Sequence, residues 1–241
     1  MKKFELTNEF ITNSYGTKLF RIRALVEFCD VEAGELGGYV EKESNLGHDG
    51  NAWVCGNAWV CGNAQVSGNA WVCGNAQVSG DARVYDDARV YDDAWVCGDT
   101  RVYGNAWVRG DAQVSGNARV RGDAQVSGNA RVCGDTRVYG NAWVRGDAQV
   151  SGNARVCSDE DYAYAHGFGS VNRTTTFFRL KDGGVGVRCG CFYGTLAQFR
   201  DKIRETHGET KKAQEYLMLA DLMELRFEED ENEVGNRKYV E

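Results

Sequence analysis

A six-residue period governs the middle of this chain. Valine recurs at every sixth position from Val54 to Val156, eighteen times in succession and without an insertion. The residue two positions before each valine is Ala, or Thr at Thr100 and Thr136, and Gly precedes Asn or Asp at nearly every boundary between repeats. Gly–Asn and Gly–Asp pairs tolerate positive φ and predict corners, whereas Ala-x-Val alternates as a short strand does. Residues 50–157 are therefore expected to form a solenoid, and a glycine in nearly every repeat excludes a helix.

A longer period groups the hexapeptides in threes. Residues 104–121 and 140–157 agree at seventeen of eighteen positions and lie 36 residues apart, which fits a coil of 18 residues. The pattern resembles the hexapeptide-repeat, left-handed β-helix family over residues 50–157. That resemblance implies triangular coils with inward valines, so we expect six coils in a prism on the order of 30 Å long. The expected fold class is mainly β: a left-handed parallel β-helix with an N-terminal β cap and a small C-terminal ββαα unit.

The segment before the repeats is expected to cover the open end of the solenoid, because stacked repeats need atypical ends. Residues 1–49 contain Gly-Gly-Tyr-Val ending at Val40, with Leu46 six residues later, and we interpret this as an imperfect first coil within a β cap. The run from Leu36 to Leu46 that leads into the first repeats resembles uncharacterised repeat proteins of bacterial phages and prophages. That resemblance implies a phage or prophage source and no particular activity.

Residues 158–241 are expected to form a separate ββαα unit with an acidic tail. A hairpin is predicted from 176–181 and 185–191 around Lys-Asp-Gly-Gly, and two helices are predicted over about 195–208 and 210–227. One face of the hairpin is expected to carry Phe178, Leu180, Val185, Val187 and Cys189. Since so small a unit seldom buries enough surface alone, we expect it to dock on the last coil or to pair with a copy of itself. A homo-oligomer, with a dimer favoured, is the expected assembly.

All six tryptophans occupy the position before valine and are expected to point outward. On the first face of the coil these are Trp53, Trp71, Trp107 and Trp143, and on the second face they are Trp59 and Trp95. Exposed aromatic rows mark contact surfaces in many proteins, which makes these residues candidates for partner contact. The alternative is that each ring lies flat over its neighbours and shields the strands.

The third face carries a row of like charge beside a tyrosine column. The candidate ligand-binding residues on this face are Arg83, Arg101, Arg119, Arg137 and Arg155 together with Tyr85, Tyr103 and Tyr139. Arginine forks bind phosphate and tyrosine rings stack on bases, so this face is predicted to hold an anionic partner. The alternative is structural: the corner residues Asp81, Asp99 and Asp135 neutralise the row.

The distribution of charge and cysteine narrows the class of partner. Net charge is −7, and residues 50–157 balance ten Asp against ten Arg, so duplex DNA is an unlikely partner while a protein or a small anionic ligand fits. With no apolar run of about 20 residues, no membrane span is expected. We expect a cytoplasmic protein, in which Cys55 and Cys73 lie on adjacent rungs as reduced thiols.

Catalysis is not indicated by the sequence. Many hexapeptide-repeat proteins are CoA-dependent acyltransferases, which use a histidine and looped-out coils; here His48, His166 and His207 all lie outside the uninterrupted repeats. We therefore assign no catalytic residue, no metal site and no cofactor. The predicted function is a non-enzymatic binding or scaffold protein that engages a host macromolecule. The alternatives are a protein that sequesters a nucleotide-type signal at an inter-subunit pocket and an acyltransferase.

Overall fold

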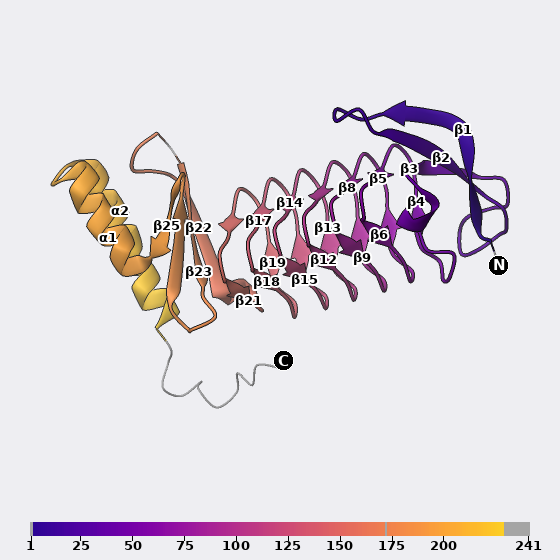
Figure 1. Ribbon diagram of the computed structural model, residues 1–241. Coiled ribbons are helices and arrows are strands. Elements are labelled where there is room, and N and C mark those ends of the chain that lie inside the picture. The colour runs from indigo at the N-terminus through magenta and orange to yellow at the C-terminus, as the bar shows by residue number, and fades with distance from the viewer. Residues whose placement is uncertain (1, 172, 229–241) are drawn as a thin grey trace.

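The computed structural model describes residues 2–171 and 173–228, and these form an elongated solenoid with a different unit at each end (Figure 1). The N-terminal unit contains β1 (Phe4–Thr12), β2 (Lys18–Ala24), β3 (Leu36–Val40) and a 3-10 turn η1 (Glu43–Asn45). The C-terminal unit contains a 3-10 turn η2 (Asp159–Asp161), β22 (Tyr162–Phe168), β23 (Arg173–Arg179), β24 (Val185–Cys189), β25 (Phe192–Thr195), α1 (Leu196–His207) and α2 (Lys211–Phe227).

Each hexapeptide contributes one two-residue strand, and every third strand falls on the same face. The first face consists of β4 (Trp53–Val54), β7 (Trp71–Val72), β10 (Arg89–Val90), β13 (Trp107–Val108), β16 (Gln125–Val126) and β19 (Trp143–Val144). The second consists of β5 (Trp59–Val60), β8 (Gln77–Val78), β11 (Trp95–Val96), β14 (Gln113–Val114), β17 (Arg131–Val132) and β20 (Gln149–Val150). The third consists of β6 (Gln65–Val66), β9 (Arg83–Val84), β12 (Arg101–Val102), β15 (Arg119–Val120), β18 (Arg137–Val138) and β21 (Arg155–Val156).

The prediction of a parallel β-solenoid with 18-residue coils is confirmed. Strands of one face pair in parallel with residues 18 positions apart, as Val90 does with Val72 and Val108. Six complete coils follow an incomplete first turn, in which Val40 pairs with Val60 and Leu46 bridges to Val66. The solenoid therefore has about seven turns, and the segment before the repeats supplies the first of them.

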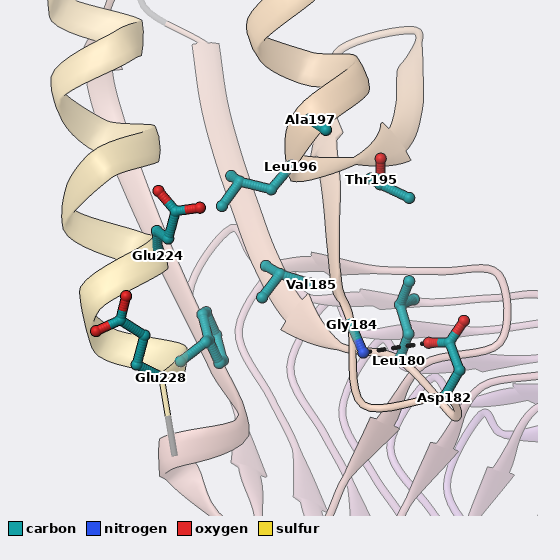
Figure 2. A pocket seen from close by; sticks show the side chains of 10 residues that line it. Leu180, Asp182, Gly184, Val185, Thr195, Leu196, Ala197, Glu224 and Glu228 are labelled. Carbon is teal, nitrogen blue, oxygen red and sulfur yellow. Dashed lines mark hydrogen bonds between the residues drawn. The ribbon is translucent and has the colours of Figure 1, made fainter. Parts of the chain in front are cut away.

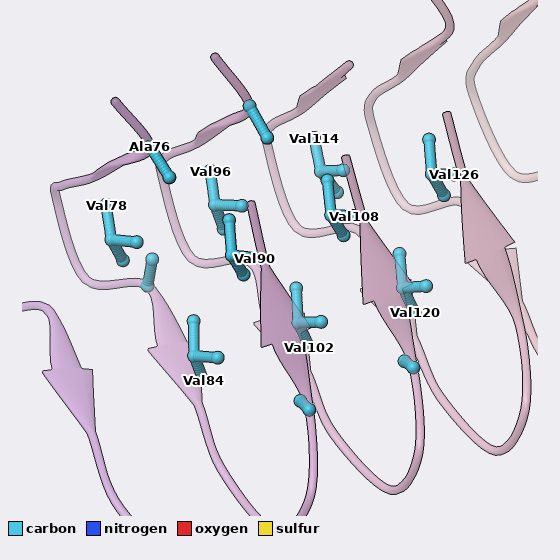
Figure 3. Close-up of a cluster of buried hydrophobic side chains, with 14 of the residues drawn as sticks. Ala76, Val78, Val84, Val90, Val96, Val102, Val108, Val114, Val120 and Val126 are labelled. Atoms are coloured by element: carbon cyan, nitrogen blue, oxygen red, sulfur yellow. The ribbon is translucent and has the colours of Figure 1, made fainter. Parts of the chain in front are cut away.

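The core of the solenoid is a stack of valine and alanine columns (Figure 3). Every valine of the repeats is completely buried, and so is every alanine two positions before it. Thr100 and Thr136 take two of the alanine positions, and their hydroxyls donate to the carbonyls of Cys97 (2.6 Å) and Cys133 (2.7 Å). Because these hydroxyls find acceptors within their own corners, the two substitutions leave no polar group unpaired in the core.

The corners explain the glycine period. Gly104 has φ of +70°, and a Cβ on it would lie 3.0 Å from the amide nitrogen of Gly122 in the next coil. A side chain is thus disfavoured both by the backbone conformation and by the coil above. Asp86 and Asp92 replace glycine at two corners and keep the same conformation, with φ of 58° and 59°.

The N-terminal unit extends the second face and covers the first coil. The sheet order is β1-β2-β3-β5, with β3 parallel to β5. Beneath this unit Trp53 is fully buried, and its ring meets that of Phe28 edge-on with centroids 5.4 Å apart. A Cβ on Gly37 would lie 2.7 Å from the Trp53 ring, so glycine is needed there for the close approach. The prediction that all six tryptophans point into solvent is wrong for Trp53, because the cap packs on it.

The C-terminal unit has a wider sheet than predicted. The expected hairpin is present as β23 and β24, and β22 and β25 add one strand at each edge to give the order β22-β23-β24-β25. Both helices are confirmed, with Thr195 and Thr210 as N-caps and Gly208 at the end of α1. Of the predicted acidic tail, residues 229–241 lie outside the described residues.

The prediction of which residues share a face of this hairpin is wrong. Arg179 pairs with Val185, and the register therefore sets Phe177 opposite Val187. Phe177, Val187 and Cys189 face the two helices, whereas Phe178 and Leu180 belong to the core of the solenoid. The unit consequently docks on the last coil through the opposite face of its sheet.

A buried ion pair marks the junction between the last coil and the C-terminal unit. Arg179 Nε donates to Asp161 Oδ1 at 3.3 Å, and Asp161 Oδ2 accepts from the amides of Cys157 (2.8 Å) and Ser158 (3.0 Å). Tyr162 donates its hydroxyl to the carbonyl of Trp143 at 2.6 Å. These contacts fix the capping sheet on the open end of the solenoid.

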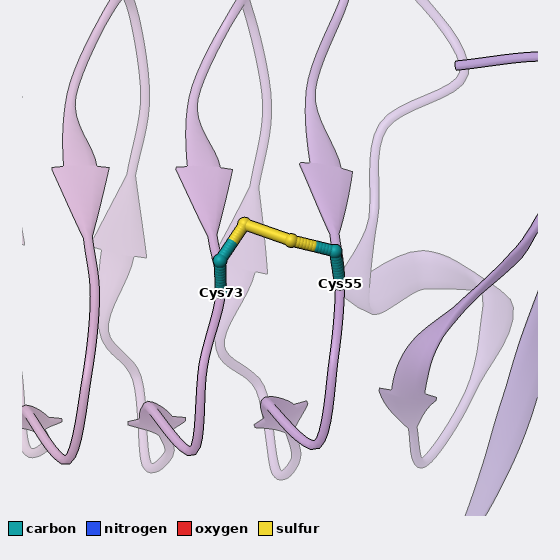
Figure 4. Close-up of a disulfide and its surroundings, with 2 residues drawn as sticks. All are labelled: Cys55 and Cys73. Carbon is teal, nitrogen blue, oxygen red and sulfur yellow. A yellow bond between two sulfur atoms is a disulfide. The ribbon is translucent and has the colours of Figure 1, made fainter. Parts of the chain in front are cut away.

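Cys55 and Cys73 form a disulfide between the first two complete coils (Figure 4). The sequence predicts that they lie on adjacent rungs, which is confirmed, and that they stay reduced, which the structure contradicts. Their Cα atoms are 4.6 Å apart, a distance set by the strand spacing and within the range that a disulfide spans.

Candidate functional site

The third face places the predicted arginines in one row. Arg101 pairs with Arg83 on one side and with Arg119 on the other, and Arg137 and Arg155 continue the row in the same register. The row results directly from the 18-residue coil, because each arginine holds the same position in its own coil. Five guanidinium groups thus follow one line along the solenoid at strand spacing, about 4.8 Å per step.

This row is not neutralised by direct ion pairs. Within residues 2–171 and 173–228, none of the five arginines lies within 4.0 Å of a carboxylate. Two of the corner aspartates expected to offset the charge are instead hydrogen-bonded along the corners: Asn63 donates to Asp81 at 3.0 Å, and Asn117 donates to Asp135 at 2.9 Å. Arg83 and Arg101 are exposed, so the charge of the row is available at the surface.

The tyrosine column beside the row is a stack of rings. Tyr85 and Tyr103 stack with centroids 4.9 Å apart and planes only 5° from parallel, and Arg121 lies 5.4 Å from the ring centre of Tyr139. Burial raises the pKa of the Tyr85 phenol, and the neighbouring Tyr103 and Asp86 raise it further. Tyr85 therefore remains neutral at physiological pH and offers a hydroxyl that donates or accepts.

A hollow opens where this stack ends, and sequence reasoning missed it. Its volume is about 380 Å³, and it is lined by Gln65, Ser67, Gly68, Arg83, Tyr85, Asp86 and Arg101. It exists because Ser67 holds the position in the first complete coil that Tyr85 and Tyr103 hold in the next two. The signal was present in the column itself, which reads Ser, Tyr, Tyr from residue 67 to 103.

The tryptophans of the first face are held by their neighbours rather than presented as a free row. Trp107 lies between two guanidinium groups, with Arg89 and Arg109 at 5.3 and 5.9 Å from its ring. Trp143 donates from its indole nitrogen to the Ser127 hydroxyl at 2.7 Å. Trp71 is half-buried and packs against the core. These contacts favour shielding of the strands over contact with a partner.

The second face is no more continuous. Trp59 packs against a small cluster formed by Leu19, Tyr39 and Cys61 under the N-terminal unit. Trp95 is the most exposed of the six, with 36% of its surface accessible. One exposed ring between two glutamines, Gln77 and Gln113, does not make an aromatic surface.

A second hollow lies in the C-terminal unit and has the opposite charge (Figure 2). It measures about 330 Å³, with Val185, Leu196 and Phe227 among its apolar walls. Glu224 and Glu228 of α2 and Asp182 of the hairpin turn supply carboxylates around it. This hollow is unsuited to an anion.

The three histidines lie in the end units and have structural neighbours there. His48 contacts Glu43 at 2.8 Å, His166 contacts Thr174 at 2.9 Å, and His207 stacks on the ring of Tyr216. Among the described residues, no three His, Cys, Asp or Glu side chains come together as metal ligands would. None of the described helices is long and apolar enough to cross a membrane.

Comparison with known families finds a similarity for the repeat. The family model for the YdcK beta solenoid repeat matches residues 64–80, 76–87, 82–98, 112–128 and 124–140. These segments lie within the six coils and cover less than half of the chain, so they show what the repeat is similar to. No curated protein matches the chain.

Proposed function

We propose that this chain is a non-catalytic binding scaffold whose third face holds an anionic partner. The observation that carries the proposal is the row of five arginines from Arg83 to Arg155, which lie in register and form no ion pair among the described residues. Each neighbouring pair in such a row repels by about 1 kcal/mol or less in water, and an anion that bridges two arginines removes this repulsion. The planar guanidinium group of arginine also forms bidentate hydrogen bonds with a carboxylate or a phosphate.

The overall charge limits the kind of anion. Net charge is −7, so the third face is a local positive field on an acidic molecule. Tight binding of duplex DNA without sequence preference needs a locally dominant basic field over many phosphates. A protein segment or a small anionic ligand fits the row better than duplex DNA does.

The composition of the hollow supports a binding role over acyl transfer. Its lining of Gln65, Ser67, Gly68, Arg83, Tyr85, Asp86 and Arg101 contains no histidine or cysteine. Acyl transfer to a hydroxyl or amine needs a general base within hydrogen-bond reach of the acceptor. Asp86 is the lining carboxylate, and its Oδ2 already accepts from the amide of Gly104 at 3.2 Å.

The test is a charge-matched pair of triple variants. Arg101, Arg119 and Arg137 are changed to Gln together, and the control changes Arg89, Arg109 and Arg131 to Gln, which removes the same charge from the other two faces. Binding is measured by fluorescence anisotropy with two labelled probes, a 20-residue polyglutamate and a 20-nucleotide oligothymidylate, at low salt. We expect the parent to bind at least one probe and the third-face variant to bind it tenfold or more weakly, a loss of about 1.4 kcal/mol.

The control triple is expected to stay within about twofold of the parent, which corresponds to less than 0.5 kcal/mol. Circular dichroism establishes that both variants are folded. The proposal fails if the parent binds neither probe, or if the two variants lose the same affinity.

We also propose that the chain is a dimer through its C-terminal unit. On α2, Met218, Leu222 and Leu225 are 71%, 54% and 67% exposed and follow one another at helical spacing. A solvent-facing apolar stripe of this kind is typical of a helix that pairs with another helix. Light scattering is expected to give twice the chain mass for the parent and a single chain mass for Leu222→Glu. A parent that stays monomeric at a protein concentration of about 100 μM excludes this dimer.

The proposed handedness, source and compartment rest on the resemblances of the sequence. We propose that the coil is left-handed, that the protein is phage or prophage encoded with a host macromolecule as its partner, and that it acts in the cytoplasm. The Cys55–Cys73 disulfide is the feature of the structure that stands against a reducing compartment. Thiol labelling of the protein inside intact cells tests the compartment directly.

A further inference from the structure

The hollow on the third face lies where the next ring of the tyrosine stack would be. Tyr85 stacks on Tyr103 with one side of its ring, at 4.9 Å, and its other side faces the coil that carries Ser67. The column repeats once per coil, so the next ring along it would lie over Ser67 at the same spacing. A serine leaves that position open, and the hollow of about 380 Å³ occupies it.

A planar aromatic group is the shape that fits this position. Ring stacking between tyrosine and a nucleic-acid base is tolerant of the base, because every base has a π face. In this site the Tyr85 ring is already held parallel to Tyr103 within 5°, so the stacking platform does not have to be ordered when a ligand binds. The volume also falls in the range of about 300–1,000 Å³ that small-molecule sites have.

The polar groups around the hollow specify a charged ligand. Arg83 and Arg101 lie on adjacent rungs at its edge, and with Asp86 they give the lining a net charge of +1. Asp86 has one oxygen engaged with Gly104, and its other oxygen makes no hydrogen bond within the described part of the chain. Together with the amide of Gln65, that oxygen can take hydrogen bonds from the edge of a base or from sugar hydroxyls.

We infer that this hollow binds a nucleoside monophosphate, with its base stacked on Tyr85 and its phosphate held by Arg83 and Arg101. The inference rests on the proposed anion-binding face and names its ligand class. The site is built from one chain and needs no second copy, so it differs from an inter-subunit pocket. Arg119, Arg137 and Arg155 lie farther along the row and are outside the hollow.

The decisive variant completes the ring stack. Ser67→Tyr places in the first complete coil the residue that the column carries at Tyr85 and Tyr103, and the new ring fills the position proposed for the base. The arginine row is unchanged by it. The matched control is Ser115→Tyr, which adds the same ring to the second face. Tyr85→Leu removes the stacking platform while it keeps both arginines.

Binding of AMP, adenosine and inorganic phosphate is measured by isothermal titration calorimetry with the full chain. We expect AMP to bind the parent and the Ser115→Tyr control alike, and to bind Ser67→Tyr and Tyr85→Leu at least tenfold more weakly. Adenosine and phosphate are each expected to bind the parent at least tenfold more weakly than AMP does. Unchanged affinity of Ser67→Tyr for AMP would overturn the inference, as would equal affinity of adenosine and AMP.

The two proposals fail in different ways. If the parent binds the polyanion probes through its arginine row but does not bind AMP, the nucleotide site is wrong and the anion-binding face stands. If it binds neither, both are wrong. Since Ser67→Tyr keeps all five arginines, it is expected to retain the polyanion affinity of the parent, and a loss of that affinity would show that the hollow does not act as a separate site.

Discussion

Trp53 and Trp95 occupy the same position in hexapeptides that share Ala-Trp-Val-Cys, and their truncation tests where the N-terminal unit lies. Trp53 is completely buried, whereas 36% of Trp95 is exposed. Replacing a fully buried tryptophan with alanine costs about 3–5 kcal/mol. The Trp53 indole nitrogen has no hydrogen-bond partner among the described residues, and the removal of this unpaired donor offsets part of the loss. We therefore expect Trp53→Ala to lower the free energy of unfolding by about 3 kcal/mol.

Trp95→Ala is the matched control, since partial burial at an exposed sheet surface makes its contribution about 1 kcal/mol. Guanidinium unfolding at 25 °C, followed by far-ultraviolet circular dichroism, measures both variants against the parent. The difference of about 2 kcal/mol corresponds to roughly a thirtyfold change in the unfolding equilibrium constant. Equal losses in the two variants would refute the placement of β1, β2 and β3 over Trp53, because an uncovered Trp53 would resemble Trp95.

Three further outcomes follow from the coil and its cap. Replacing Cys55 and Cys73 with serine should lower the free energy of unfolding by about 3 kcal/mol for a closed loop of this length, and dithiothreitol should destabilise the parent to the same level without affecting the variant. Deleting residues 104–139 removes two whole coils and joins Tyr103 to Gly140 in the original register, so circular dichroism should show a folded protein. A molten or aggregated product would contradict the 18-residue coil. Burial lowers the pKa of Lys3 from 10.5 to about 8, so between these pH values the folded chain has lost a proton that the unfolded chain keeps. The free energy of unfolding of the parent should therefore rise from pH 8 to pH 10.5 relative to that of Lys3→Met. Parallel pH profiles of the two proteins would show that Lys3 is not buried.

Features that repeat with the coil could be predicted from the sequence. The inward valines, the corners and the arginine row depend only on the position of each residue within 18, and the same local signal is repeated six times. Arg101 lies beside Arg83 and Arg119 for the same reason that Val102 lies beside Val84 and Val120. The helix ends in the C-terminal unit were predictable too, because Thr195 and Thr210 cap through contacts within three residues.

Features that depend on long-range contacts could not be predicted in this way. The hexapeptide pattern predicts that Trp53 points outward, whereas Phe28 and Gly37 of the N-terminal unit pack on its ring and bury it. The strand β25 has four residues and no alternating pattern of its own, and it exists because it pairs with β24. The column Ser67, Tyr85, Tyr103 indicates the gap, but the parallel stacking of the Tyr85 ring on Tyr103 could not be predicted from it.

The salt dependence of binding can distinguish the arginine row from the hollow as two separate sites. Residues 50–157 carry no net charge, because ten Asp balance ten Arg; the aspartates lie at corners, whereas five of the arginines form the row on the third face. The segment before the repeats is acidic, with six basic against nine acidic residues, so a long polyanion meets repulsion at the N-terminal end of the row. A single-stranded oligonucleotide held by all five arginines should lose affinity with a slope of about −3.5 in a plot of log K against log salt. AMP, held by Arg83 and Arg101 alone and by stacking on Tyr85, should respond to salt much less steeply. Equal slopes for the two ligands would mean that the row and the hollow are not distinct sites.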